Sequence, residues 1–285
     1  MSKIFQKIIA AVLVLGTIFF TSCQKEFTID NSDIVPADST VVTQLDSNNI
    51  SKIIFYDSAN GVSNVFHTRT FIYDTLKRLI QITESESNRL GTSYYFYYQG
   101  TSSLSTGYLM FDSLALQMGN QPERHYFTRD NQGRLIKDSL IGNPGFFEIS
   151  KYSYSGNTLV LERADYNSYN IIATTIATLD SNGNIIKYVT NEPAQNIRDS
   201  AMFTYDNRRS PYFRLRGTFE ILTDHAVYDY ETPLFMKNNM KTLYQSDPGL
   251  PIINNISYTY NGAGYPIFAH ETDEDVYIRY FYKSL

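Results

Sequence analysis

The chain contains one cysteine and no tryptophan among 285 residues. A single cysteine cannot form an internal disulfide, so burial of apolar side chains must stabilise the fold, and the chain is long enough for that. No apolar stretch after the first 22 residues approaches the roughly 20 residues that a membrane-spanning helix needs. Lysine and arginine form no basic stripe and the net charge is −5, which argues against a nucleic-acid partner.

Recognisable catalytic and metal-binding motifs are also missing. The sequence has no Gly-x-Ser-x-Gly turn and no phosphate-binding loop. No metalloprotease spacing links the four histidines, which are His67, His125, His225 and His270. A possible carboxylate pair for glycoside hydrolysis would have to come from an acidic group that we expect in a solvated hairpin turn, namely Glu271, Asp273, Glu274 and Asp275. We therefore expect no enzymatic activity, no metal site and no cofactor.

The one cysteine ends a hydrophobic leader. Lys3 and Lys7 precede an apolar run over residues 8–20, and Thr21 and Ser22 lead to Cys23. This order is typical of a signal peptide with a small-residue cleavage site. It resembles the lipobox of bacterial lipoproteins, which implies that residues 1–22 are removed and that Cys23 carries the lipid. The alternative is an ordinary secretory leader that happens to end in cysteine.

The residues after Cys23 indicate a location and a tether. Gln24, in place of Asp, implies outer-membrane sorting by the same resemblance, and Gln24-Lys25-Glu26 is similar to the surface-export signal of Bacteroidota lipoproteins. Residues 23–51 are rich in Ser, Thr, Asp and Asn, so we expect a flexible polar tether. Residues 52–285 then form a single domain.

One repeat organises that domain. An aromatic residue, any residue, a second aromatic residue and a turn residue recur at steps of about 25 residues. Residues two apart in a strand face the same side, so each aromatic pair builds an apolar stripe. Asp or Asn then favours a turn, and glycine supplies a positive φ. The eight copies are residues 71–74, 96–99, 127–130, 152–155, 177–180, 203–206, 228–231 and 258–261.

The repeat predicts an all-β fold. Each unit of about 25 residues makes one hairpin, so eight units make a large antiparallel meander of about sixteen strands. A sheet of that size must curl to protect its edges, and we expect a barrel or half-barrel. Lys187 and Arg279 fall within strands that a membrane barrel would keep apolar on its lipid side, so we expect a soluble domain.

Two resemblances follow from these motifs. Asp130, Gly133, Arg134 and Leu135 resemble the YD repeat of Rhs-type shell proteins. The leader, the tether and the hairpin from Tyr258 to Pro266 together are similar to uncharacterised Bacteroidota outer-membrane lipoproteins with a porin-like β fold. The second resemblance covers nearly the whole chain. It implies fold and location, and no activity.

Two sets of residues are candidate sites. The tyrosines of the repeat could stack on sugar rings or hold apolar ligands, although most of them also suit a sheet core. They are Tyr73, Tyr98, Tyr154, Tyr205, Tyr230 and Tyr260. Asp followed by Ser or Thr resembles the O-glycosylation sequon of exported Bacteroidota proteins, although such pairs also serve turns. The candidate acceptors are Ser39, Ser58, Thr75, Ser113, Ser139 and Ser200.

Three functions remain open at this point. The leading hypothesis is a non-catalytic envelope lipoprotein that binds a glycan, an apolar small molecule or another envelope protein, held at the membrane by its lipid. The second is an Rhs-like structural shell. The third, and the least favoured, is a glycan-acting hydrolase with an unfamiliar site.

Overall fold

The computed structural model describes residues 49–59, 62–87, 91–142, 147–165, 168–195, 197–215, 237–246, 252–273 and 275–284. Helix is confined there to α2 (Ser113–Gln117), η1 (Pro193–Gln195) and η2 (Phe213–Leu215). The strands are β1 (Asn49–Ala59), β2 (Val62–Tyr73), β3 (Leu79–Glu86), β4 (Thr92–Tyr98), β5 (Ser105–Asp112), β6 (Glu123–Arg129), β7 (Leu135–Ile141), β8 (Phe147–Ser155), β9 (Thr158–Asp165), β10 (Ile171–Leu179), β11 (Ile185–Glu192), β12 (Ile197–Arg209), β13 (Asn238–Ser246), β14 (Ile252–Tyr260), β15 (Pro266–Glu271) and β16 (Val276–Lys283).

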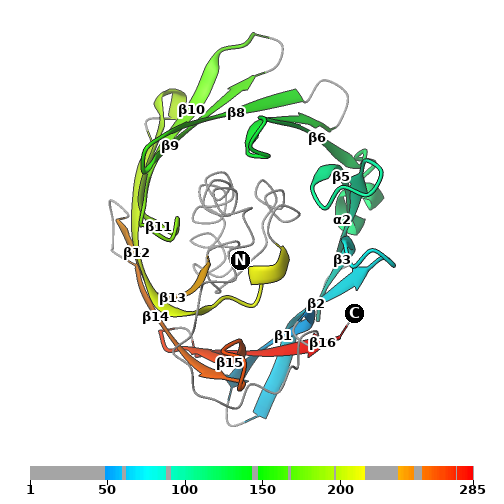
Figure 1. Ribbon diagram of the computed structural model, residues 1–285, viewed down its shortest axis with the longest axis vertical. Helices are drawn as coiled ribbons and strands as arrows, with labels where there is room; N and C mark the ends of the chain where they lie inside the picture. The colour runs from blue at the N-terminus through cyan, green and yellow to red at the C-terminus, as the bar shows by residue number, and fades with distance from the viewer. Residues whose placement is uncertain are drawn as a thin grey trace.

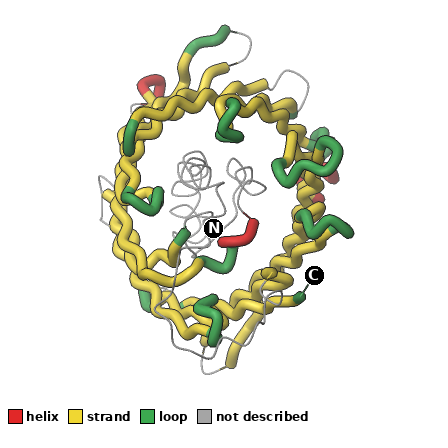
Figure 2. The backbone as a smooth tube through the Cα atoms, in the orientation of Figure 1, coloured by secondary structure: helices red, strands yellow, loops and turns green. Residues whose placement is uncertain are grey.

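The strands form one closed barrel. Each strand pairs antiparallel with its neighbours in sequence, and β1 pairs with β16 to close the ring. Figure 1 shows the ring viewed along its opening, and Figure 2 shows the strands following one another around it. The predicted all-β meander of about eight hairpins, curled into a barrel, is confirmed. Strand β1 begins at Asn49, within the stretch expected to be tether.

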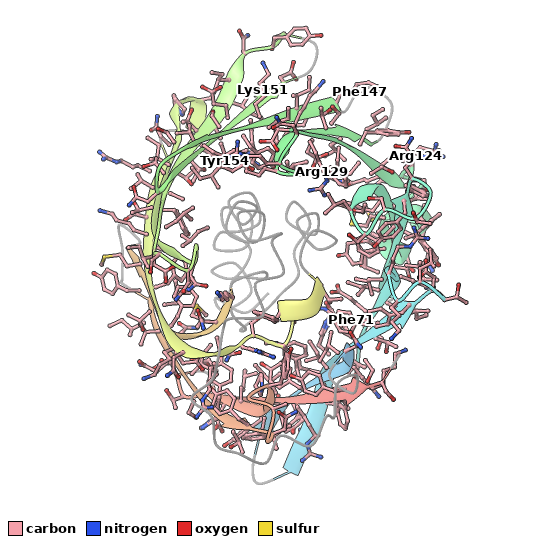
Figure 3. All side chains as sticks on the ribbon, viewed as in Figure 1. Phe71, Arg124, Arg129, Phe147, Lys151 and Tyr154 are labelled. Carbon is pink, nitrogen blue, oxygen red and sulfur yellow. The ribbon has the colours of Figure 1, made fainter. Side chains whose placement is uncertain are left out.

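Alternation along each strand produces an inner and an outer wall. Figure 3 shows the side chains of Phe71, Arg129 and Tyr154 pointing into the ring, and those of Arg124 and Lys151 pointing out. Since side chains two residues apart share a face, these labels fix the orientation of their strands. The inner wall carries the buried core cluster, which includes Phe55, Phe71, Tyr152 and Phe203.

The same turn closes several hairpins at one end of the barrel, called here the turn end. In the β6–β7 turn, Asp130 Oδ1 accepts the backbone N–H groups of Gln132 and Arg134 at 2.9 Å. Asp74, Asp180 and Asn261 accept equivalent bonds in the β2–β3, β10–β11 and β14–β15 turns. Gly133 has φ 80°, a conformation that glycine adopts without strain, as the turn pattern predicts. The opposite end is called the loop end.

A tyrosine at the turn end of six strands ties each strand to the one before it. Its hydroxyl donates to the backbone carbonyl of a residue at the start of the preceding strand, at 2.5–2.9 Å. The donor and acceptor pairs are Tyr73 and Ile50, Tyr98 and Leu79, Tyr154 and Leu135, Tyr205 and Ile185, Tyr258 and Met240, and Tyr282 and Pro266. Strand β6 instead uses Arg129, whose Nε donates to the Ser105 carbonyl at 3.4 Å.

Arginines from the turns reinforce this layer. Arg134 forms an ion pair with Asp130 at 2.7 Å and lies over the Tyr154 ring, 4.7 Å from its centroid. Arg78 forms the same ion pair with Asp74 at 2.7 Å and lies 4.5 Å from the Tyr98 centroid. An arginine over an aromatic face gains a cation–π attraction. Each such turn therefore braces the tyrosine of the next hairpin.

Removing one of these hydroxyls should destabilise the barrel measurably. Tyr205→Phe leaves the Ile185 carbonyl without its 2.7 Å hydrogen bond in a buried setting. We expect the free energy of unfolding to fall by about 1–2 kcal/mol, measured by urea denaturation. Tyr244→Phe is the matched control, because Tyr244 faces outward and is exposed. A loss as large in the control as in Tyr205→Phe would contradict the role of the hydroxyl.

The turn aspartates should make stability depend on pH. Burial alone would raise the pKa of Asp130, but the hydrogen bonds and charge of Arg134 and the amide of Gln132 outweigh it and hold the pKa below its ordinary value. The unfolded chain ionises near pH 4, so the stabilisation is complete above that pH and is lost as pH falls through the lower folded pKa. Asp130→Asn should lose about 1 kcal/mol or less at pH 7, because the group is partly exposed.

Denaturant unfolding between pH 7 and pH 2 measures this effect. The gap in unfolding free energy between the native protein and Asp130→Asn should shrink below about pH 4, as the native carboxylate protonates. Glu162→Gln is the control, since Glu162 lies mid-strand on the outer wall and closes no turn. A gap that stays constant with pH would show that the Asp130 carboxylate does not act through its charge.

Candidate functional site: the inner wall of the barrel

The inner wall is arranged in layers from the turn end to the loop end. The tyrosines that bond the preceding strand form the first layer. A second layer of apolar side chains, mostly aromatic, follows, and its buried members include Phe71, Phe96, Tyr152, Phe203 and Tyr280. Ionisable residues become frequent only in the layers nearer the loop end. The wall is therefore amphipathic along the axis of the barrel.

Most of the predicted binding tyrosines lie in the first layer. Tyr73, Tyr98, Tyr154 and Tyr205 all point inward, and their hydroxyls are engaged by backbone carbonyls. Burial first, and the neighbouring Tyr98 second, raise the pKa of Tyr73 above its ordinary value. These contacts give the four tyrosines a structural role, and their binding of sugars or apolar molecules stays a prediction.

The other two predicted tyrosines are placed differently. The Tyr260 hydroxyl donates to the Asp206 carboxylate, and burial followed by this hydrogen bond raises the pKa of Tyr260. Tyr258, two residues earlier, makes the bond to the preceding strand instead. Tyr230 lies outside the described residues. The last strand supplies a copy that the repeat analysis missed, because Tyr280 and Tyr282 follow the same pattern without a turn after them.

A buried histidine–aspartate pair lies on β6 and β7. His125 Nδ1 and Asp138 Oδ2 are 2.8 Å apart, and both side chains are almost fully buried. The Tyr108 ring stacks on the imidazole, with centroids 4.2 Å apart and planes 9° from parallel. Sequence reasoning gave His125 no partner, because the two residues are 13 apart and only the strand register brings them together.

A second buried pair joins β2 to β3 and to the β12–β13 connection. Arg69 and Glu84 are directly opposite in the register, and Arg69 Nε donates to Glu84 Oε1 at 2.7 Å. Arg69 Nη1 donates to the Tyr212 hydroxyl at 3.1 Å. The described residues that follow β12, which include η2, lie inside the ring (Figure 1), and Tyr212 among them packs against Phe71. The described part of this connection therefore crosses from β12 to the wall at β2.

A third charged group lies further around the wall. Arg163 Nη2 donates to Glu192 Oε1 at 3.0 Å, and Arg163 Nε is 4.0 Å from Glu148 Oε1. These residues come from β9, β11 and β8, and all three side chains are largely buried. The guanidinium thus lies between two carboxylates at the loop end.

His67 lies on β2, two residues before Arg69, and faces inward as Arg69 does. It is 4% exposed, and its Nε2 is buried without a hydrogen-bond partner. The imidazole makes an edge-on contact with the Phe55 ring, with centroids 5.1 Å apart. Burial and then the nearby Arg69 guanidinium lower the pKa of His67 to about 3, so the ring is neutral at pH 7.

Charge is divided between the two walls among the described residues. Strand residues that share the inward face of the buried core carry most of the acids, and the outer wall carries most of the bases. The inward acids include Asp57, Glu84, Glu86, Asp112, Glu123, Asp138, Glu148, Asp165, Glu192 and Glu271. The outward bases are Lys52, Arg124, Lys137, Lys151, Lys187, Arg198, Lys241 and Arg279.

One expectation about the acids was wrong. Glu271 is fully buried at the end of β15, where Oε1 accepts the Asp273 backbone N–H at 3.0 Å, and it is not solvated. Closure of the barrel turns the end of this strand inward. Asp273 and Asp275 are exposed as expected, and Glu274 lies outside the described residues.

The predicted modification sites are only partly placed. The residues Cys23 and Ser39, and the side chain of Ser58, are not among those that the structure describes. Thr75 is exposed in the β2–β3 turn. Ser113 Oγ donates to the Gly91 carbonyl at 2.7 Å, while Ser139 and Ser200 are half-buried on their strands. Lipidation and glycosylation at these positions stay predictions.

The described ranges contain neither a metal-binding cluster nor a membrane-spanning helix. No three or more His, Cys, Asp or Glu side chains there come together in a way that could hold a metal ion. None of the helices there is long and apolar enough to cross a membrane.

Comparison with known proteins shows the fold. A porin-like protein from Bacteroides uniformis ATCC 8492 matches 83% of this chain and 99% of its own, with a TM-score of 0.52 and 12% identity. One from Bacteroides vulgatus ATCC 8482 matches the same shares at 12% identity and a TM-score of 0.48. No family model and no curated protein matches the sequence. The chain thus has a fold similar to that of a Bacteroides porin-like protein.

Breaking the buried Arg69–Glu84 pair should be costly. Arg69→Met removes the buried guanidinium that donates to the Glu84 carboxylate and to the Tyr212 hydroxyl. We expect the free energy of unfolding to fall by about 3–5 kcal/mol in denaturant titrations. The double variant Arg69→Met with Glu84→Met should lose much less, because no uncompensated charge remains.

The matched control is Arg124→Met. Arg124 is exposed and points outward (Figure 3), so its loss should change the unfolding free energy by no more than about 0.5 kcal/mol. A double variant as unstable as Arg69→Met alone would show that the pair is not the source of the stability.

Proposed function

We propose that this protein is a non-catalytic envelope barrel, tethered by a lipid on Cys23, whose inner wall holds an apolar or amphipathic ligand. The observation that carries the proposal is the polarity of the two walls. The inner wall presents tyrosine, phenylalanine and aliphatic layers, and the outer wall presents serine, threonine and lysine between scattered apolar residues. Ligand sites in proteins are mostly apolar, with a few placed polar groups.

The same polarity supports a barrel that does not insert into the membrane. Outer-membrane barrels carry an apolar band outside and a polar interior. Here Lys151, Lys187 and Arg279 lie exposed on the outer wall, and a cation facing lipid at the bilayer midplane costs about 2–4 kcal/mol. A lipid anchor gives membrane attachment without that cost. The porin-like fold is thereby compatible with a soluble, tethered role.

Tryptophan placed on either wall can test both parts of the proposal, because the native chain has none. Phe203 faces inward at 4% exposure, and its neighbour Met202 faces outward at 48% exposure. A brominated alkyl ligand should quench the indole fluorescence of Phe203→Trp and leave Met202→Trp unchanged. Vesicles of brominated phospholipid should quench neither variant when the chain lacks its lipid.

Each variant tests a different part of the proposal. Quenching of Met202→Trp by brominated vesicles would show that the outer wall faces lipid and would overturn the non-inserting barrel. Absence of any saturable quenching of Phe203→Trp by brominated alkyl chains would overturn the ligand-binding inner wall. Circular dichroism of both variants serves as the check that each one folds.

A further inference from the structure

The outer wall carries two exposed tyrosines on either side of a glycine. Tyr97 is opposite Gly107 in the β4–β5 register, and Gly107 is opposite Tyr126 in the β5–β6 register. Tyr97 is 44% exposed and Tyr126 is 48% exposed. Two strand spacings separate them, so their Cα atoms are about 10 Å apart across the sheet. These three residues are called here the tyrosine platform.

Nothing in the described part of the chain occupies the two tyrosine rings. Neither side chain forms a hydrogen bond or a ring contact with a described residue. Gly107 carries no side chain that could stand between them. A Cβ atom there would lie 2.2 Å from the His125 carbonyl oxygen, so the close approach of β6 requires glycine at this position. The platform is therefore a fixed feature of the wall.

Bases border the tyrosine platform. Arg124 lies two residues before Tyr126 on β6, and Lys137 is opposite Thr128, two residues after it. Lys151 comes next around the ring, opposite Lys137. The side chains of Arg124 and Lys151 point outward (Figure 3). Among the described residues of β4 to β8, the outer faces carry these three bases and no aspartate or glutamate.

The bases have no counter-charge in the described part of the chain. Arg124, Lys137 and Lys151 form no ion pair with a described residue, and this includes Glu162, which is opposite Lys151 on β9. Like charges directly opposite each other, as in Lys137 and Lys151, destabilise a sheet. An anion bound beside them would offset this repulsion. This side of the outer wall therefore favours a negatively charged ligand.

We infer that the tyrosine platform and its three bases bind an acidic glycan, a chain of sugar rings that carry carboxylates. A tyrosine ring offers a flat apolar face to a sugar ring and a hydroxyl to its polar groups. Arginine and lysine donate charge-assisted hydrogen bonds to carboxylates. The inference concerns the outer wall and so goes beyond the ligand proposed for the inner wall. It rests on one part of the proposed function, a barrel that does not insert into the membrane.

Calorimetric titration of Cys23→Ser with hexagalacturonate and with its methyl ester tests the inference. This variant keeps the whole chain and removes the proposed lipid site. The ester has the same sugar rings without their charges. The acid should bind at least about tenfold more tightly than the ester, because the bases pair with its carboxylates. Its affinity should fall as the salt concentration rises.

Two tyrosine variants assign the stacking. Tyr97→Ala combined with Tyr126→Ala should weaken binding of the acid and of the ester about tenfold each, because stacking does not depend on charge. Tyr244→Ala is the matched control, since Tyr244 is exposed on the outer wall at β13, away from the platform. It should change neither affinity.

Two lysine variants assign the charge. Lys137→Gln combined with Lys151→Gln should weaken binding of the acid about tenfold and leave the ester unchanged. Lys187→Gln is the matched control, since Lys187 is exposed on the outer wall at β11. Circular dichroism checks that each variant folds. The comparison of acid with ester needs neither pair of substitutions.

Several results would overturn the inference. They include no binding of either saccharide, and binding of the ester as tight as that of the acid. Vesicles of phosphatidylglycerol and a thymidine oligonucleotide carry negative charge without sugar carboxylates. Tighter binding of either one than of hexagalacturonate, lost in the lysine variant, would assign the surface to a different partner.

The inference and the proposed function fail in distinguishable ways. Quenching of Met202→Trp by brominated vesicles would overturn the non-inserting barrel and the glycan site together. Absence of saccharide binding while Met202→Trp stays unquenched would overturn the glycan site alone. Quenching of Phe203→Trp by brominated alkyl chains reports on the inner wall independently of both saccharides.

Discussion

Pairing of β1 with β16 is the constraint on which the rest of the structure depends, because it turns a meander into a ring. A closed sheet has no free edge and divides its residues between two walls. Because side chains alternate along a strand, one placed residue fixes the wall of its neighbours as far as the next register shift. The same two-residue period that buries Phe71 inside also assigns Arg69 and His67 to the interior. Closure thus explains why the barrel has an apolar core and buried charge on one surface.

At the turn end, a lattice of tyrosine–carbonyl hydrogen bonds and cation–π contacts follows the ring. Each tyrosine hydroxyl bonds the strand before it, so the bonds cross from strand to strand between the ladder hydrogen bonds. The lattice also crosses the seam, since Lys283 of β16 lies 5.0 Å from the Tyr73 ring centroid of β2, while Tyr73 bonds Ile50 of β1 between them. The contact that spans the seam is a lysine over a tyrosine ring, comparable to the arginine–tyrosine contacts at the turns. The repeat therefore stabilises closure as well as each hairpin.

The sequence predicted the number of strands well because the repeat is local: an aromatic stripe and a turn residue lie within a few positions of each other. It could not predict which side chains meet across the wall, because Arg69 and Glu84, or His125 and Asp138, meet only through register. In β14 the tyrosine that bonds the preceding strand is Tyr258, while Tyr260 donates to the Asp206 carboxylate, and the sequence pattern does not distinguish the two. Glu271 was misjudged for the same reason, since its burial comes from the ring and not from its acidic neighbours.

The segment that follows β12 carries a tyrosine that contacts both the aromatic layer and the charged region of the inner wall. Tyr212 places its ring against Phe71 in the aromatic layer and its hydroxyl against Arg69 in the charged region. One side chain thus spans the boundary between the two layers. It satisfies a guanidinium with its polar end and an aromatic face with its apolar body, as tyrosine does in mixed surroundings.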